Sequence, residues 1–220
     1  MKKWVIMLAA ATIAAGAFAD SNTVSSANIL GYIATTNAPA LFIKGVQLDD
    51  GINTPQSMYG DTLPKGSTIY KFDGENYAIS TYTDVFVPGS GLVAKWSVDI
   101  IFKNGEGYWL QLPGMNSFVN SGDVLMDDSI TISINEGLQM LSYPYPVDRL
   151  ITDLGLTPSK GDNLYVFDGT NYLISSYTDV FVPGSGLVTK WSNEDVEIFA
   201  GQGFWYETTK PFEWTVTRPF

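Results

Sequence analysis

The chain has 220 residues, with 23 acidic and 12 basic side chains, and it contains neither cysteine nor histidine. These two absences exclude disulfides, Cys/His zinc sites, thiol and Ser-His-Asp nucleophiles, and a histidine general base. The formal net charge of −11 disfavours binding to nucleic acid or to anionic lipid surfaces.

The N-terminus has the pattern of an export signal. Two lysines precede an apolar run at 4–15, and Ala17 and Ala19 are the small residues that a signal peptidase recognises. The pattern predicts a signal peptide at 1–19, because the apolar run is shorter than the ~20 residues that a membrane span needs. Its removal changes the formal charge to 10 − 23 = −13. We expect an exported protein of the periplasm, cell surface or extracellular space, with no transmembrane span in the mature chain.

An internal repeat fills the mature chain. Residues 70–97 align with 165–192 at an offset of 95, and 23 of the 28 positions are identical. Within them, the stretch YTDVFVPGSGLV at 82–93 occurs again, unchanged, at 177–188. A period of this length is typical of a small domain and too long for a solenoid repeat. The repeat therefore predicts two tandem modules of one fold.

The boundary between the modules is expected where turn-forming residues concentrate. The stretch PGMNSFVNSGD at 113–123 is rich in such residues. We predict a first module at 20–119 and a second at 120–220, following the signal peptide.

Within each module the pattern is that of β structure. Four runs rich in β-branched and aromatic residues predict short strands: 67–72, 76–83, 108–112 and 128–134. Helical pattern is limited to 53–62 and 147–155, one short helix or 3-10 turn per module. We therefore predict an all-β protein, built of two tandem homologous β-sandwich or small open-barrel modules with at most one short helix each.

Turn residues join the predicted strands. The sequence Asp-Gly-Glu at 73–75 fits a hairpin loop, and Pro-Gly at 88–89 suits the central positions of a type II turn. A Gly-x-Gly segment at 105–107, repeated at 201–203, precedes an aromatic strand in each copy. Glycines at such positions let a neighbouring backbone or ring approach closely.

A module with an aromatic-Asp-Gly hairpin, a Pro-Gly turn and a terminal Gly-x-Gly-aromatic-Trp strand resembles uncharacterised secreted proteins of Gram-negative bacteria that carry it in tandem. The stretch SANILGY at 26–32 is similar to the start of the same proteins. The resemblance covers nearly the whole mature chain. It implies an exported surface or periplasmic protein, and it brings no reaction or ligand with it.

Catalytic patterns are scarce. The glycines at 89–94 match G-x-G-x-x-A, but no helical pattern follows, so we interpret them as turn residues. Carboxylate pairs are the remaining catalytic device, and the copies clearly share only Asp73 with Asp168 and Asp84 with Asp179. We interpret the first pair as hairpin residues and the second as turn or cap residues. We assign no catalytic residue, no metal ligand and no cofactor.

Aromatic residues that recur in both copies are the candidate ligand-binding residues. Exposed rings on a β face can stack on sugars, whereas buried rings supply the bulk of a core without disulfides. Core packing is the favoured interpretation, and both stay open for six residues: Tyr77, Tyr82, Trp96, Tyr172, Tyr177 and Trp191. We expect four further aromatic residues in the module cores: Phe72, Trp109, Phe167 and Trp205.

The leading functional hypothesis is a non-enzymatic structural or adhesive protein of the cell envelope or extracellular matrix. It rests on the missing catalytic residue types, the repeat and the recurring aromatic residues. Its expected partner is itself, as a homo-oligomer paired through free edge strands, or an envelope or extracellular glycan. The alternatives are a carbohydrate-binding protein that uses the paired aromatic residues and a carboxylate-based glycoside hydrolase.

Overall fold

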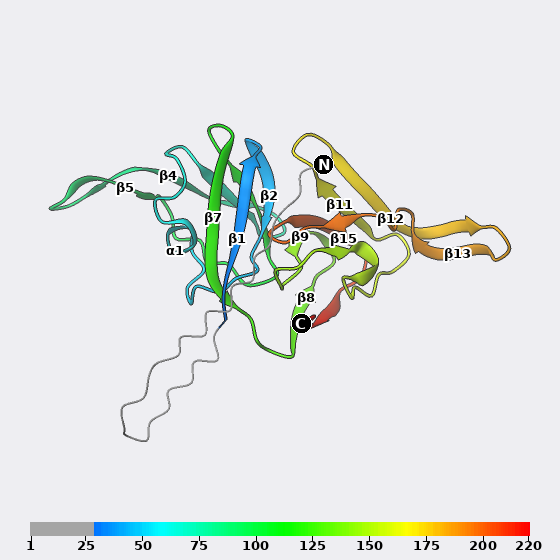
Figure 1. The fold of residues 1–220 in the computed structure, drawn as a ribbon. Coiled ribbons are helices and arrows are strands. Elements are labelled where there is room, and N and C mark those ends of the chain that lie inside the picture. The colour runs from blue at the N-terminus through cyan, green and yellow to red at the C-terminus, as the bar shows by residue number, and fades with distance from the viewer. Residues whose placement is uncertain (1–28) are drawn as a thin grey trace, which may run out of the picture.

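The computed structural model describes residues 29–220, so the predicted signal peptide at 1–19 lies outside the described residues. The fold is all-β, as predicted, and consists of two similar modules (Figure 1). The first contains β1 (Ile29–Ala38), β2 (Leu41–Gly45), α1 (Pro55–Tyr59), β3 (Thr68–Phe72), β4 (Tyr77–Val87), β5 (Gly91–Trp96), β6 (Gly107–Gln111) and β7 (Asn116–Val124). The second contains β8 (Ser129–Ile134), β9 (Gly137–Ser142), β10 (Arg149–Leu150), the 3-10 turn η1 (Ile151–Asp153), β11 (Asn163–Phe167), β12 (Tyr172–Val182), β13 (Gly186–Trp191), β14 (Glu197–Ile198), β15 (Gly203–Thr208) and β16 (Phe212–Thr217).

Each module pairs a five-stranded antiparallel sheet with a two-stranded ribbon. The sheet of the first module has the order β2-β6-β3-β4-β5, and that of the second has the equivalent order β9-β15-β11-β12-β13. The ribbons are β1 with β7 and β8 with β16. Phe118 of β7 packs in one apolar cluster with Ile69 and Leu110 of the sheet, which makes the ribbon the second layer of that module.

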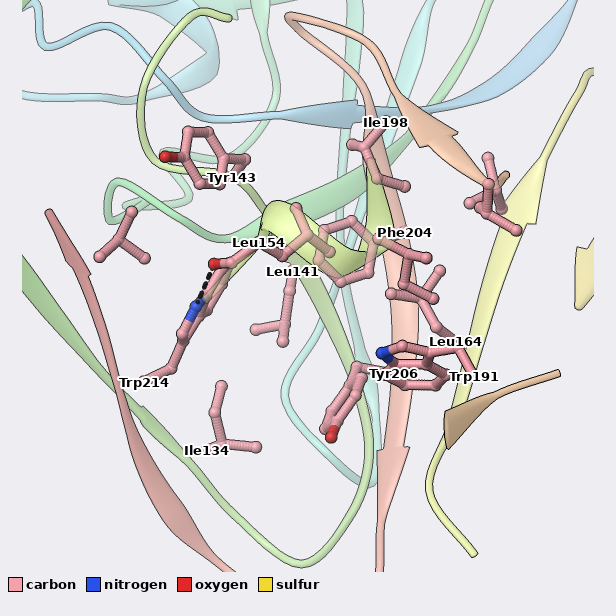
Figure 2. Close-up of a cluster of buried hydrophobic side chains, with 14 of the residues drawn as sticks. Ile134, Leu141, Tyr143, Leu154, Leu164, Trp191, Ile198, Phe204, Tyr206 and Trp214 are labelled. Atoms are coloured by element: carbon pink, nitrogen blue, oxygen red, sulfur yellow. Dashed lines mark hydrogen bonds between the residues drawn. The ribbon is translucent and has the colours of Figure 1, made fainter. Parts of the chain in front are cut away.

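The core of the second module is built in the same way (Figure 2). Phe204 and Tyr206 of β15 lie in one cluster with Trp214 of β16 and Trp191 of β13. The indole Nε1 of Trp214 donates to the carbonyl of Leu154 at 2.8 Å, so this large ring is buried with its polar atom satisfied.

The turn and helix predictions are confirmed. Helix α1 begins after Thr54, which caps it and accepts from Ser57 N, and η1 lies within the second predicted helical stretch. Asp73 Oδ1 accepts from the backbone of Glu75 and Asn76 at 2.9 and 2.8 Å. These backbone donors lower the pKa of Asp73, and Asp168 makes the equivalent bonds with the same effect on its pKa.

The predicted boundary after residue 119 falls inside strand β7. This strand pairs with β1 from Asn116 to Val124, so the pairing joins the whole of β7 to the first module. We therefore define module 1 as 29–124 and module 2 as 129–220, linked by 125–128. The turn formers in this stretch occupy a strand because β1 supplies its pairing partners.

The Gly-x-Gly segments bring the two modules together. Gly45 N donates to Gly201 O at 2.9 Å, and in the equivalent contact Ser142 N donates to Gly105 O at 2.7 Å. A Cβ atom on Gly203 would lie 2.6 Å from Lys44 O. The close approach predicted for these glycines is therefore present, and the neighbour is the backbone of the other module.

The aromatic residues expected in the two module cores pack mainly between the modules. The ring of Phe72 meets that of Trp205 at 5.3 Å, and Phe167 meets Trp109 at 5.2 Å, both edge to face. All four belong to one cluster at the junction, together with Ile43 and Met140. Trp205 is buried and the other three rings are partly buried, and the surface that covers them belongs to the opposite module.

Within residues 29–220, the structure has no helix with the length and apolar character that crossing a membrane requires.

Candidate functional site

Two long hairpins leave the body of the molecule on opposite sides (Figure 1). Strand β3 pairs with β4 only along 77–81, so the remainder of β4 and all of β5 form a two-stranded ribbon. The β12–β13 hairpin is built in the same way in module 2. We call these segments, 83–95 and 178–190, the long hairpins.

The tips of the long hairpins are apolar and exposed. Phe86 faces Leu92 across the first hairpin, and Phe181 faces Leu187 across the second. The exposed fractions of these four side chains are 68, 71, 70 and 71%. Large apolar side chains are normally turned inward, so each tip presents a hydrophobic pair to whatever lies outside the module.

The tip geometry follows from its turn residues. Ser90 N donates to Val87 O at 3.0 Å, and Gly89 takes a φ of +85°, as a Pro-Gly type II turn requires. Gly91 has a φ of +79° where β5 begins. The second hairpin repeats both the bond and the angles, so the two tips have the same backbone conformation.

Four of the six candidate aromatic residues anchor the hairpins in the module cores. The rings of Tyr82 and Trp96 lie 5.8 Å apart, and those of Tyr177 and Trp191 lie 5.4 Å apart. Trp96 is only 3% exposed and Trp191 only 5%, and Tyr82 is also buried, so these three rings have no free face for stacking on a ligand. Tyr177 is partly buried and packs against the module 2 core.

The remaining two candidates, Tyr77 and Tyr172, lie near each other at the junction. Each is 44% exposed and packs 5.1 Å from its neighbour Phe72 or Phe167. Burial raises the pKa of Tyr172, and the phenol of Tyr77 adds to the rise, as expected where two hydroxyl groups approach across the junction. The structure thus brings one candidate from each copy to a shared, partly exposed aromatic surface.

Ion pairs brace the base of each long hairpin. Lys65 Nζ lies 2.6 Å from Asp84, and Lys160 Nζ lies 2.5 Å from Asp179. The hydrogen bond from Lys160 lowers the pKa of Asp179. The interpretation of Asp84 and Asp179 as turn or cap residues was wrong, because both lie inside strands and bind a lysine from the preceding loop.

The carboxylates shared by the copies therefore all have local structural partners. In the part of the chain that the structure describes, no three Asp or Glu side chains come together in a way that could hold a metal ion.

Sequence reasoning did not single out a small polar hollow in module 1. Lys44 Nζ lines it and donates to Thr35 Oγ1 at 3.2 Å. Three other lining atoms, Gln47 Nε2, Asp50 Oδ2 and Asn120 Oδ1, are buried and find no hydrogen-bond partner within residues 29–220. The hollow measures about 20 Å³, which is room for a water-sized molecule and not for an organic ligand.

The exposed hairpin tips were also not recognised as a site from the sequence. The sequence signal for the tips was the unbroken identity of 82–93 with 177–188. This identity indicates a function only when the side chains are known to be exposed.

In comparisons with known proteins, the chain matches no protein family, no curated protein and no solved structure.

Proposed function

We propose that this is an exported, non-enzymatic structural protein whose copies join to one another through the long hairpins. The observation that carries the proposal is the pair of apolar tips, identical in sequence and in conformation, on opposite sides of one molecule.

The fold does not explain why the two hairpins have the same amino-acid sequence. The two copies in one chain have the same age, yet the residues before position 67 have little in common with their counterparts, whereas 82–93 and 177–188 are unchanged. Phe86 and Leu92 are exposed, so packing within the module does not require them. Retention of exposed apolar side chains in both copies favours a role in contact with another molecule.

A second copy of this chain is the partner that the hairpins fit. Strands β5 and β13 are the outer strands of their sheets, and beyond residue 82 the other edge of the first ribbon is also without a sheet neighbour within residues 29–220. An isolated two-stranded ribbon is marginally stable in water, and unpaired edges are templates for strand addition. Antiparallel pairing of two identical hairpins is isologous, so each hairpin offers the other the same unpaired strand edge and the same apolar tip.

The opposite edges of the two sheets are occupied. Strands β2 and β9 lie against the other module, where Gly45 and Ser142 make the junction hydrogen bonds. Within the five-stranded sheets, the hairpin edges are therefore the ones available for assembly. A molecule with equivalent self-pairing ends on two sides makes an open chain of copies.

Light scattering across a range of protein concentrations tests this proposal. Burying two Phe–Leu pairs per contact contributes on the order of 6 to 12 kcal/mol before the cost of association, so we expect the average mass to rise with concentration. The fourfold variant Phe86→Asp, Leu92→Asp, Phe181→Asp and Leu187→Asp should stay monomeric. The matched control is Ile101→Asp with Val119→Asp, which alters exposed apolar residues outside the hairpins and should assemble as the unmodified chain does.

Three results would overturn the proposal. The first is a chain that is monomeric at every concentration, and the second is a fourfold variant that still assembles. The third is binding of the tips to lipid vesicles without self-association, which would make a membrane the partner.

Binding of a neutral glycan is the second candidate function, favoured by the exposed rings of Tyr77 and Tyr172 at the junction. Aromatic platforms of this kind stack on sugar rings. A glycan array with the Tyr77→Ala, Tyr172→Ala double variant tests it, since loss of any hit would support stacking at the junction.

A further inference from the structure

A larger hollow lies in module 2, between the 3-10 turn η1 and strand β16. It measures about 370 Å³, within the range of small-molecule sites. The chain contains two arginines, Arg149 and Arg218, and both line this hollow. In a protein with 23 acidic side chains, this is a local concentration of guanidinium groups.

The two arginines differ in how they are paired. Arg218 is held by the carbonyl of Met126 and by Asp128, whose Oδ1 lies 3.1 Å from Nη2. Arg149 lies over the ring of Tyr143, 5.4 Å from its centroid, and makes no ion pair within residues 29–220. Its Nε is buried with no hydrogen-bond partner in the same residues. The guanidinium of Arg149 thus has no carboxylate partner among the described residues, and a carboxylate is the group that fits a guanidinium best.

The other residues that line the hollow indicate which class of carboxylate ligand it would bind. Asp153 also lines it, and a second carboxylate would repel a simple anion. It would, however, accept hydrogen bonds from ligand hydroxyls, and Thr215 and Thr217 on β16 add hydroxyls of their own.

We propose that this hollow binds a hexuronic acid residue of an acidic polysaccharide. Its carboxylate meets Arg149, and its hydroxyls meet Asp153 and the threonines. The site goes beyond the proposed self-assembly and does not depend on it, because none of these residues belongs to a long hairpin.

Calorimetric titration of the protein with methyl galacturonide, and with methyl galactoside as its neutral match, tests the assignment. The uronide should bind and the neutral sugar should bind more weakly by roughly tenfold or more, the value of a hydrogen-bonded charge pair. Arg149→Gln should abolish this preference. Arg149→Lys should restore only part of it, because a lysine lacks the planar fork. Lys210→Gln removes one positive charge from an exposed turn of the same module and should leave binding unchanged.

A second variant separates the roles of the two charges and does not disturb a buried group. Asp153 is exposed, so Asp153→Asn should fold normally, weaken binding of the uronide and strengthen binding of acetate, which has no hydroxyls. The proposal fails if the uronide does not bind, if the neutral sugar binds equally well, or if Arg149→Gln leaves the preference intact. It also fails if Asp153→Asn strengthens uronide binding, since Asp153 would then only repel the ligand.

Discussion

Lys44 is a lysine at a core position of module 1. It is 3% exposed, and its Nζ has Thr35 Oγ1 as a hydrogen-bond acceptor and the ring of Phe118 at 5.5 Å. Burial lowers the pKa of Lys44 from 10.5 to about 7. In module 2 the equivalent residue of the edge strand is Leu141, which is buried in the apolar core. The fold itself therefore has no need of an amine at this position.

The lowered pKa makes stability depend on pH in a defined window. Between pH 7 and pH 10.5 the unfolded chain binds a proton at Lys44 that the folded chain does not bind. The free energy of unfolding therefore rises with pH across this window. Below pH 7 both states are protonated, and the full cost of burying the charge remains. The chain has no histidine and no cysteine, so few other groups change their charge between pH 7 and 9.

We predict that Lys44→Leu stabilises the protein, on the order of a few kcal/mol at pH 6 to 7. Urea unfolding between pH 6 and 9.5 measures both parts of the prediction. The unmodified chain should become more stable as the pH rises, and Lys44→Leu should show a flat profile. Lys103→Leu, a change of an exposed lysine, should keep the slope. A Lys44→Leu variant with an unchanged slope would contradict the depressed pKa.

At the scale of elements, the Gly-x-Gly segments decide how the modules meet. Strand β15 begins at Gly203, which lies against Lys44 of β2, and strand β6 begins at Gly107, which lies against Leu141 of β9. A Cβ atom on Gly107 would lie 2.7 Å from Leu141 O. Backbone atoms cannot rotate away as side-chain atoms do, so any side chain here forces the strands apart.

Alanine substitutions test this packing. Gly107→Ala or Gly203→Ala should destabilise the chain by about 1 to 3 kcal/mol, measured as a loss of free energy of unfolding in urea. Gly114→Ala is the matched control, since a Cβ atom there has no heavy atom within 4 Å, and it should have little effect. Equal stability of all three variants would mean that the junction is looser than its hydrogen bonds indicate.

Local signals made much of this architecture predictable. The Asp-Gly and Pro-Gly turns and most of the strands follow from residue types with specific backbone preferences. The same signals do not say which surface covers a buried ring. Trp109 and Trp205 have the pattern of core residues, and only the crossing of the two modules determines that they pack at the junction.

The candidate site was less predictable than the fold. Strand β4 was expected to end near residue 83 but runs to Val87, and that extension carries Phe86 beyond the body of the module. Whether a strand continues over a core or into solvent depends on the length of the neighbouring strand, which is β3 in this case. The local sequence pattern of β4 does not contain this information. Trp96 and Trp191 recur in both copies because they anchor the hairpins.

At the scale of the whole molecule, the two modules form a particle with two equivalent ends. The formal charge of −13 expected after removal of the signal peptide makes copies repel one another at long range. At physiological salt the Debye length is about 8 Å, so this repulsion is largely screened and the apolar tips can come into contact. The proposed assembly through the tips therefore requires salt-containing surroundings.

Sedimentation velocity on a chain with one altered hairpin tests the central claim most directly. Phe86→Asp with Leu92→Asp leaves only the hairpin of module 2 able to pair, so assembly should stop at the dimer, whereas the unmodified chain continues to larger species at the same concentration. Formation of species larger than a dimer by the one-hairpin variant, or its failure to dimerise while the unmodified chain assembles, would contradict end-to-end joining through two equivalent hairpins.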